Sequence, residues 1–394
     1  MNNNIKNTEK YDVVIVGAGP AGSTAAFYTE NLKVLIVDKF DFPRHKACGG
    51  GLMSSKDWSL ELENYKRIKD ELKSYSCRSI KMYWNKMFVA KCDFKHLFDQ
   101  VDRYEFDNLL LKEALKKENV KFLKFDLQTI EKKRLNGKDV FKLSDGQVEI
   151  ETDYIIGADG MYSKVSKFLG NKNHKRHQFG YCMEYEITCE KKDLNVHVVA
   201  GYKWEIGYGW IFPTLNGYQV GIGIIRKPRK SLNYYLDDFL AWSSEKELIP
   251  KEYVIEKRFG GALPLKVVKN YCTDNILLCG DAMGLVKLLT GEGIYYAMKS
   301  GKAAGQTLTE SQKDIKKRYK KKIKPLFWDT FLTPYVPPKI FTITFWSVFF
   351  HIGKIWNYFP IGNILVKFFI KMAIHRKSSR KDSYYHDEKI KIGK

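Results

Sequence analysis

The chain has 394 residues, 44% of them hydrophobic, which indicates a globular protein with a large core and suits two closely connected domains. Lys and Arg outnumber Asp and Glu by 67 to 45, and the net charge of +22 favours an anionic partner: nucleic acid, anionic lipid or a phosphorylated substrate. No recognition motif accompanies the charge, so we expect no nucleic-acid partner. The seven cysteines form no CxxC pair or metal-ligand spacing, and the polar first ten residues contain no secretory signal; we therefore expect free thiols, no metal and a cytoplasmic protein.

The N-terminal segment predicts a βαβ unit. Val13–Val16 is typical of a buried strand, Pro20–Glu30 of a helix and Val34–Val37 of a second strand. A GAGPAG turn, residues 17–22, joins the first strand to the helix, and Asp38 follows the second strand. In this arrangement glycines allow a tight turn, the helix N-terminus attracts a pyrophosphate and the carboxylate accepts from a ribose hydroxyl. The sequence therefore predicts a dinucleotide site, and the acidic residue disfavours a 2′-phosphate.

The middle of the chain changes in pattern. From about His177 to Lys257, alternating stretches rich in Tyr, Trp and Val predict an antiparallel sheet, which we interpret as a substrate domain. Parallel-sheet character returns at Ile276–Cys279, and a long helix is expected after Gly293. The other predicted elements are a helix at Arg103–Lys116 and short strands at Lys121–Phe125, Asp139–Leu143 and Tyr154–Ile156.

The predicted fold is therefore α/β, with a discontinuous Rossmann-like domain, an antiparallel-sheet domain and a helical C-terminal region. We assign residues 1–75, 98–170 and 258–310 to the cofactor domain, 76–97 and 171–257 to the substrate domain, and 311–394 to the C-terminal region.

The C-terminal region combines apolar and basic segments. Its apolar runs, Ile340–Gly353 and Ile355–Val366, have 14 and 12 residues, whereas a membrane-spanning helix needs about 17–25. Basic segments at Lys313–Lys324 and His375–Lys381 bracket them. The runs could form a helix pair packed on the body, an interfacial membrane-docking helix, or both. We expect a peripheral protein at an anionic membrane surface.

Two strand ends carry a Gly-Asp turn, at Ile155–Gly160 and Ile276–Ala282. A carboxylate in such a turn can hold ribityl or ribose hydroxyls, although Asp159 alone could belong to an ordinary turn. With the N-terminal motif, the two turns resemble the glutathione-reductase-like FAD fold in its hydroxylase and geranylgeranyl reductase branch. In that branch the arginine of an RxxFD helix lies near the FAD pyrophosphate, which implies this position for Arg103.

Three further segments resemble the geranylgeranyl reductase family. Lys46–Leu52 is similar to its K-x-C-G-G-G loop, which passes beside the isoalloxazine, and Leu289–Ala297 to its LTGEGI segment. A helix beginning near Gly293 would direct its positive end at the flavin. Tyr208–Pro213 is similar to the YxWxFP motif, and VGIGI at 220–224 to the next strand of the family. Alternate aromatic residues on one strand form a wall, although simple sheet-core aromatics would give the same pattern.

The resemblance implies an FAD-dependent oxidoreductase that hydrogenates isoprenoid double bonds of geranylgeranyl lipids. Cys48 is the candidate proton relay or active-site thiol, and the rings of Tyr208 and Trp210 are candidates for stabilising positive charge on a tertiary carbon. No second nucleotide motif is present, so NAD(P)H, a ferredoxin or another donor must dock transiently. A flavin monooxygenase acting on aromatic or polyketide substrates, and a flavin electron-transfer or lipid-binding protein without turnover, are the alternatives. The head group and the number of reduced bonds stay open.

The predicted site residues fall into two sets that share the motifs above. The predicted cofactor contacts are Gly17, Gly19, Pro20, Ala21, Gly22, Asp38, Lys39, Lys46, Cys48, Gly49, Gly50, Arg103, Asp159, Gly160, Gly280, Asp281, Gly291, Gly293 and Ile294. The predicted substrate contacts are Tyr208, Trp210, Phe212, Pro213, Gly221 and Gly223.

Overall fold

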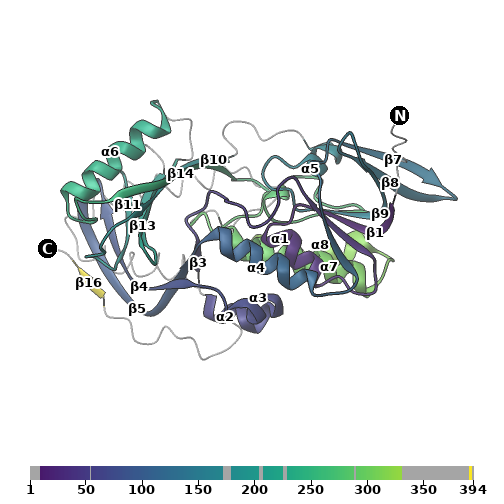
Figure 1. Ribbon diagram of the computed structural model, residues 1–394, viewed down its shortest axis with the longest axis horizontal. Coiled ribbons are helices and arrows are strands. Elements are labelled where there is room, and N and C mark those ends of the chain that lie inside the picture. The colour runs from purple at the N-terminus through teal and green to yellow at the C-terminus, as the bar shows by residue number, and fades with distance from the viewer. Residues whose placement is uncertain are drawn as a thin grey trace, which may run out of the picture.

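A computed structural model describes residues 9–53, 55–171, 179–203, 207–224, 229–287, 290–330 and 390–392. The predicted apolar runs at 340–353 and 355–366 and the basic segment at 375–381 lie outside these residues. Two sheets occupy opposite ends of an elongated molecule, with most of the helices beside the first sheet and one helix on the second (Figure 1). The α/β fold predicted from the sequence is thereby confirmed.

The first sheet has seven strands in the order β6-β2-β1-β9-β8-β7, with β15 also paired to β9. Its central strands are parallel and strongly apolar, because neighbouring structure covers both faces. β7 and β8 form an antiparallel hairpin at the edge. The bounds are β1 Glu9–Val16, β2 Val34–Asp38, β6 Val120–Lys124, β7 Thr129–Leu135, β8 Lys138–Ser144, β9 Glu149–Gly157 and β15 Ile276–Leu278.

Close helix packing supports this sheet. α1 (Pro20–Phe27) lies against α4 (Arg103–Leu115) and α7 (Ile294–Glu310). The contact between α1 and α7 depends on two glycines: a Cβ atom at Gly301 or Gly305 would come within 2.2 or 2.4 Å of α1 carbonyl oxygens. α8 (Ile315–Thr330) packs on α7, and its Tyr319 hydroxyl donates to the Leu278 carbonyl at the end of β15.

The second sheet has nine strands in the order β14-β10-β13-β12-β11-β4-β5-β16, with β3 paired to β5. The bounds are β3 Gly51–Met53, β4 Ser74–Trp84, β5 Met87–Val101, β10 Phe179–Thr188, β11 Val196–Ala200, β12 Gly207–Pro213, β13 Gly217–Ile224, β14 Val254–Pro264 and β16 Ile390–Ile392. The remaining short helices are α2 Ser55–Glu61, α3 Glu63–Ile68, α5 Lys164–Phe168 and the 3-10 turn η1 Gly280–Ala282.

The structure corrects two details of the second sheet. Residues 177–257 were expected to form only strands, but α6 occupies Leu232–Glu245 and packs on β10 and β13. Its N-cap, Ser231, accepts from the Tyr234 amide, and Leu236, Phe239 and Leu240 recur on its buried side at helical spacing. In addition, β4 and β11 pair in parallel, because the chain returns to β4 from a distant segment and not through a hairpin.

The strands predicted at Val13–Val16 and Tyr154–Ile156 lie within β1 and β9, and the helix expected after Gly293 is α7. The helix predicted at Pro20–Glu30 ends earlier, at Phe27, because Asn31 takes a positive φ of 58° at the turn into β2. All seven cysteines are free thiols.

Candidate functional site

A cavity of about 780 Å³ lies between the two sheets. The carboxyl ends of β1, β2 and β9 form one part of its wall, which is where α/β sheets bind ligands. β10, β12, β13 and β14 of the second sheet form the opposite part, and the loop at 44–51 passes between them. Residues from both predicted domains therefore meet at one site.

The GAGPAG turn has the geometry that its glycines predict. Gly17 has a φ of 103°, and a Cβ atom there would lie 2.3 Å from the Ala158 carbonyl oxygen. A Cβ atom at Gly22 would lie 1.8 Å from the Gly17 oxygen, so Gly22 serves helix packing and does not line the cavity. The Asp38 Oδ2 atom accepts from the Ala18 amide at 2.9 Å, which ties the acidic end of β2 to the turn.

A buried charge cluster stands beside this turn. Arg103 donates from Nε and Nη2 to the two Asp107 carboxylate oxygens, each at 2.7 Å, and Arg44 Nη1 lies 3.3 Å from Asp107 Oδ2. Burial opposes the charged form of Arg103, but Asp107 holds its pKa above the ordinary value. The second guanidinium also reaches the turn, since Nη2 of Arg44 would lie 3.3 Å from a Cβ atom at Gly19.

One carboxylate thus stands against two guanidinium groups, leaving a net positive charge where a pyrophosphate would lie. Arg103 was predicted from the sequence, whereas Arg44 was not. The only sequence signal for Arg44 was its place in the loop between Asp38 and Lys46.

Asp159 lines the cavity. Its Oδ2 accepts from the Lys164 and Val165 amides at 2.6 and 3.3 Å, at the start of α5. The other oxygen, Oδ1, is buried and has no hydrogen-bond partner in the described part of the chain, and burial raises the pKa of Asp159. Asp281 also lines the cavity, whereas Gly280 does not; a Cβ at Gly280 would lie 3.2 Å from the Cβ atoms of Ala21 and Ala297.

The start of α7 is tied to the second sheet. Gly293 is its N-cap, and Gly291 before it has a φ of 70°. The Tyr208 hydroxyl on β12 donates to the Thr290 carbonyl at 2.6 Å. Burial raises the pKa of Tyr208 well above its ordinary value, so this phenol stays protonated and holds the loop in place.

The predicted aromatic wall is a continuous row of rings. Tyr208 and Trp210 have centroids 5.8 Å apart, Trp210 and Phe212 are 6.2 Å apart, and Phe212 stands 5.1 Å from Phe98. The Trp210 Nε1 atom is buried and has no hydrogen-bond partner among the described residues. This Nε1 atom faces the loop at 44–51, since a Cβ atom at Gly49 would lie 3.4 Å from it.

A polar network that was not predicted from the sequence holds the Cys48 loop. Glu184 Oε1 on β10 accepts from the Cys48 amide at 2.7 Å, and Gln219 Nε2 on β13 donates to the Cys48 carbonyl at 2.9 Å. Gln100 Nε2 in turn donates to Gln219 Oε1 at 3.2 Å. Burial raises the pKa of Glu184 to about 7.

The structure brings nearly all predicted site residues to this cavity. Those that do not line it are Gly22, Gly280, Pro213 and Gly221. Gly221 nevertheless supports the aromatic row, because a Cβ atom there would lie 2.2 Å from Trp210 Cζ2. Charged cavity residues that the sequence did not predict include Arg44, Glu184 and Glu292.

Known proteins share the sequence and the fold of this chain. Residues 10–329 match the model of the FAD binding domain family. The digeranylgeranylglycerophospholipid reductase of Methanococcus vannielii is 30% identical over 77% of this chain and 78% of that protein. Among solved structures, a geranylgeranyl bacteriochlorophyll reductase-like protein of Thermoplasma acidophilum has a TM-score of 0.71 at 24% identity, covering 82% of this chain and 84% of that one. A flavin-dependent halogenase has a TM-score of 0.62 at 21% identity over 82% of this chain and 62% of its own.

The residues of the cavity fit FAD. Gly17 and Gly19 line the cavity at the start of α1, where the helix amides suit a pyrophosphate, and the two arginines supply its countercharge. The Asp159 oxygen that has no partner among the described residues can accept from a ribityl hydroxyl. The remaining space lies beside the aromatic row and the α7 N-terminus, whose partial positive charge suits an electron-rich ring.

Proposed function

This chain belongs to the FAD-binding oxidoreductase family that includes the digeranylgeranylglycerophospholipid reductases, and we propose that it hydrogenates the isoprenoid double bonds of geranylgeranyl lipids. One observation carries the proposal: the aromatic row, the Cys48 loop and the start of α7 line the same cavity as the dinucleotide turn. An apolar chain entering beside the rings would thus reach the cofactor. We also propose a geranylgeranylated phospholipid as substrate, because a relative of this name shares most of the chain.

The aromatic residues would exclude water, contact the lipid chain and stabilise positive charge, while the cofactor supplies the hydride. When bound and reduced by an external donor, FAD would supply the hydride for one alkene carbon. The rings of Tyr208, Trp210 and Phe212 exclude water and contact the apolar lipid chain. Each CH₂ group of the lipid that is buried there contributes about 0.8 kcal/mol to the binding free energy. The ring faces also stabilise positive charge on a tertiary carbon by about 1–2 kcal/mol in a dry site.

Cys48 would stand at the reacting end of the cavity. Its amide and carbonyl are both held, by Glu184 and Gln219, so the loop can present either its backbone or its thiol at a set position. We propose the thiol as a proton relay, and Cys48→Ser as the substitution that separates this role from a purely structural one.

The test of the function is anaerobic. FAD-loaded protein is reduced with dithionite and mixed with a digeranylgeranyl glycerophospholipid or with geranylgeranyl diphosphate, and the products are weighed by mass spectrometry. We expect one added H₂ per reduced double bond, with the phospholipid preferred. Heat-denatured protein with free reduced FAD is the control, and it should leave both lipids unchanged.

Other outcomes would favour other functions. A hydroxylated product formed only with O₂ would favour the monooxygenase alternative. Unchanged lipid, with flavin reoxidised only by air, would favour an electron carrier. NAD(P)H, a ferredoxin or another reductant would dock transiently, and substituting each for dithionite identifies the donor.

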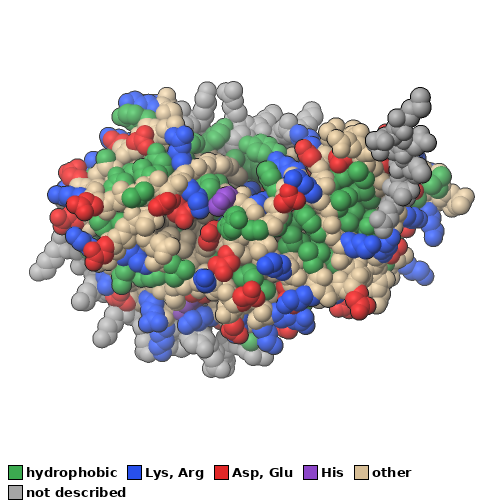
Figure 2. Space-filling model, viewed as in Figure 1, with side chains coloured by type: hydrophobic (Ala, Val, Ile, Leu, Met, Phe, Trp, Pro, Cys, Tyr) green, Lys and Arg blue, Asp and Glu red, His purple; other side chains and the backbone are tan. Residues whose placement is uncertain are grey.

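We propose in addition that the enzyme docks at an anionic membrane surface through α8. Figure 2 shows acidic and basic side chains intermixed over the face in view, so the positive excess is not gathered there. On α8, by contrast, exposed residues at helical spacing form a basic stripe that ends in an exposed tryptophan. The stripe consists of Lys317, Lys320, Lys321, Lys324 and Trp328. No helix in the described residues is long and apolar enough to cross a membrane.

A further inference from the structure

Glu184 lies at the centre of the second sheet and faces the cavity. In the strand register it stands opposite Gly221 of β13 and Phe259 of β14, and Gly221 in turn stands opposite Trp210 of β12. Because Gly221 has no side chain, the Trp210 indole fills the space above it. The Glu184 carboxyl therefore lies in the strand row that carries the aromatic wall, at the wall of the cavity and 3% exposed.

The groups around Glu184 give it no ion-pair partner in the described part of the chain. The Arg103 guanidinium on α4 lowers the pKa of Glu184, but Arg103 is already paired with Asp107 through two hydrogen bonds. Glu186, two residues on along β10, pairs with Lys257 of β14 at 3.5 Å and repels charge on Glu184. Its other neighbours are neutral donors, the Cys48 amide and the Gln219 side chain. The thiols of Cys48 and Cys182 and the phenol of Tyr208, all facing the cavity, bring no positive charge.

Burial outweighs these favourable contacts, and a buried carboxyl without an ion pair of its own favours the neutral acid. We propose, on the basis of the reductase function above, that Glu184 is the acid that supplies the proton in alkene reduction. The O–H bond of Glu184 breaks as its proton moves to the sulfur of Cys48, the relay proposed above, and the S–H proton of Cys48 forms the new C–H bond at one alkene carbon. The hydride at the other carbon is the contribution of the reduced cofactor, so the alkene gains both electrons. Glu184 is left as a carboxylate and regains its proton from water before the next turnover.

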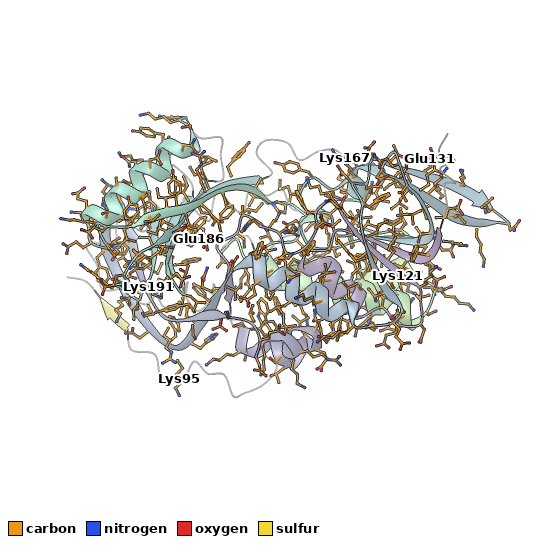
Figure 3. The ribbon with its side chains drawn as sticks, viewed as in Figure 1. Lys95, Lys121, Glu131, Lys167, Glu186 and Lys191 are labelled. Atoms are coloured by element: carbon orange, nitrogen blue, oxygen red, sulfur yellow. The ribbon has the colours of Figure 1, made fainter. Side chains whose placement is uncertain are left out.

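The first test measures the proton on Glu184 directly and does not depend on turnover. FAD-loaded protein labelled with ¹³C at the glutamate side-chain carboxyl is titrated by NMR. We expect one resonance with a midpoint at about pH 7 that is absent in E184Q. The matched control is E186Q, on the same strand and face (Glu186 is labelled in Figure 3) but not among the residues that line the cavity. It should keep that resonance, with the midpoint at lower pH because Glu186 raises the pKa of Glu184. A carboxyl at position 184 that is fully ionised at pH 6 would overturn the proposal.

The second test measures hydrogenation in a single turnover after dithionite reduction. E184Q keeps an acceptor for the Cys48 amide, and we expect it to bind FAD and to be reduced normally. Its hydrogenation rate should fall by about a hundredfold or more, the usual contribution of general acid catalysis. The wild-type rate should decline as pH rises through about 7, and the decline should be absent in the residual rate of E184Q.

The outcomes separate the two proposals. Equal rates and equal pH profiles for E184Q and the wild type would overturn the role of Glu184 while leaving the reductase function intact. A wild-type protein that reduces no lipid would overturn the function, whatever the NMR titration shows. Should E184Q fold poorly, E184D provides the second variant: it keeps an acid in the cavity, and a rate closer to the wild type than to an E184A protein supports the assignment, whereas equal losses in both overturn it.

Discussion

The indole ring of Trp210 lies directly over Gly221 of the neighbouring strand, so closely that a Cβ atom there would stand 2.2 Å from Cζ2 and 2.8 Å from Nε1. The two residues are register partners of β12 and β13. We expect Gly221→Ala to push the indole into the cavity or distort the strands, at a cost of about 1–3 kcal/mol in unfolding free energy. Denaturant unfolding measures the loss, and lipid reduction should fall while FAD remains bound.

Gly223→Ala is the matched control, on the same strand and in contact with the same ring. A Cβ atom at Gly223 would lie 3.5 Å from both Trp210 Cζ3 and Cys182 Sγ, an ordinary van der Waals separation. Its unfolding free energy should therefore stay within about 0.5 kcal/mol of the wild type. Equal destabilisation by the two substitutions would contradict the steric role of Gly221.

Arg44 should contribute to FAD affinity. It lies beside Gly19 and shares Asp107 with Arg103, and a hydrogen bond to a charged group contributes about 1.5–3 kcal/mol. We expect Arg44→Met to weaken FAD binding by about ten- to a hundredfold, measured by quenching of flavin fluorescence. Arg134→Met, on the exposed edge strand β7, removes the same charge far from the cavity and should not change the affinity. No loss in the Arg44 variant would place the pyrophosphate elsewhere.

Glu184 should make the stability of the protein depend on pH. Its pKa in the fold is about 7 against an ordinary value of 4.5, so between these values the folded protein binds more protons than the unfolded chain. Unfolding free energy is therefore lost as pH rises through this window, by about 3 kcal/mol at 1.36 kcal/mol per pKa unit. E184Q removes this loss. In urea unfolding, the unfolding free energy of E184Q relative to that of the wild type should rise between about pH 4.5 and about pH 8. A difference in unfolding free energy that stays constant with pH would mean that the carboxyl ionises freely in the fold.

Local patterns in the sequence were sufficient for the dinucleotide half of the fold. The apolar run of β1, the glycine turn and Asp38 lie within a few dozen residues, so spacing alone predicts their arrangement. α6 was missed because its run of Tyr, Phe and Trp has strand propensity, while the capping serine and the helical spacing of its buried residues were the stronger signal.

The network around Cys48 could not be predicted in the same way. Glu184 reaches the Cys48 amide across 136 residues of sequence, and a lone glutamate on a predicted strand gives no sign of its partner. Arg44 likewise meets Asp107 only through tertiary packing. The residues found from sequence were those whose function depends on local backbone geometry, and those missed were long side chains that meet through the sheet register and helix packing.

The basic stripe of α8 should govern membrane binding. One side of the helix is exposed and carries the four lysines of the stripe, Lys317, Lys320, Lys321 and Lys324. The other side is buried and includes Tyr319 and Ile323. A lysine near an anionic surface contributes about 1 kcal/mol, so changing all four to Gln should weaken binding to phosphatidylserine-containing vesicles by up to about a thousandfold. Co-sedimentation at low and high salt measures it, and the salt dependence should decline with the affinity.

The control for this variant must remove the same charge from another surface. Lys121, Lys132, Lys133 and Lys138 are exposed on β6, β7 and β8, so their replacement by Gln lowers the net charge equally. If net charge alone governed the interaction, both variants would lose vesicle binding to the same extent, and the α8 proposal would be wrong. If the stripe is the docking face, the control binds as the wild type does.

Trp328→Ala should also weaken vesicle binding, and this loss should not depend on salt. The Trp328 ring is 74% exposed beside the lysines and would enter the lipid interface through apolar contact.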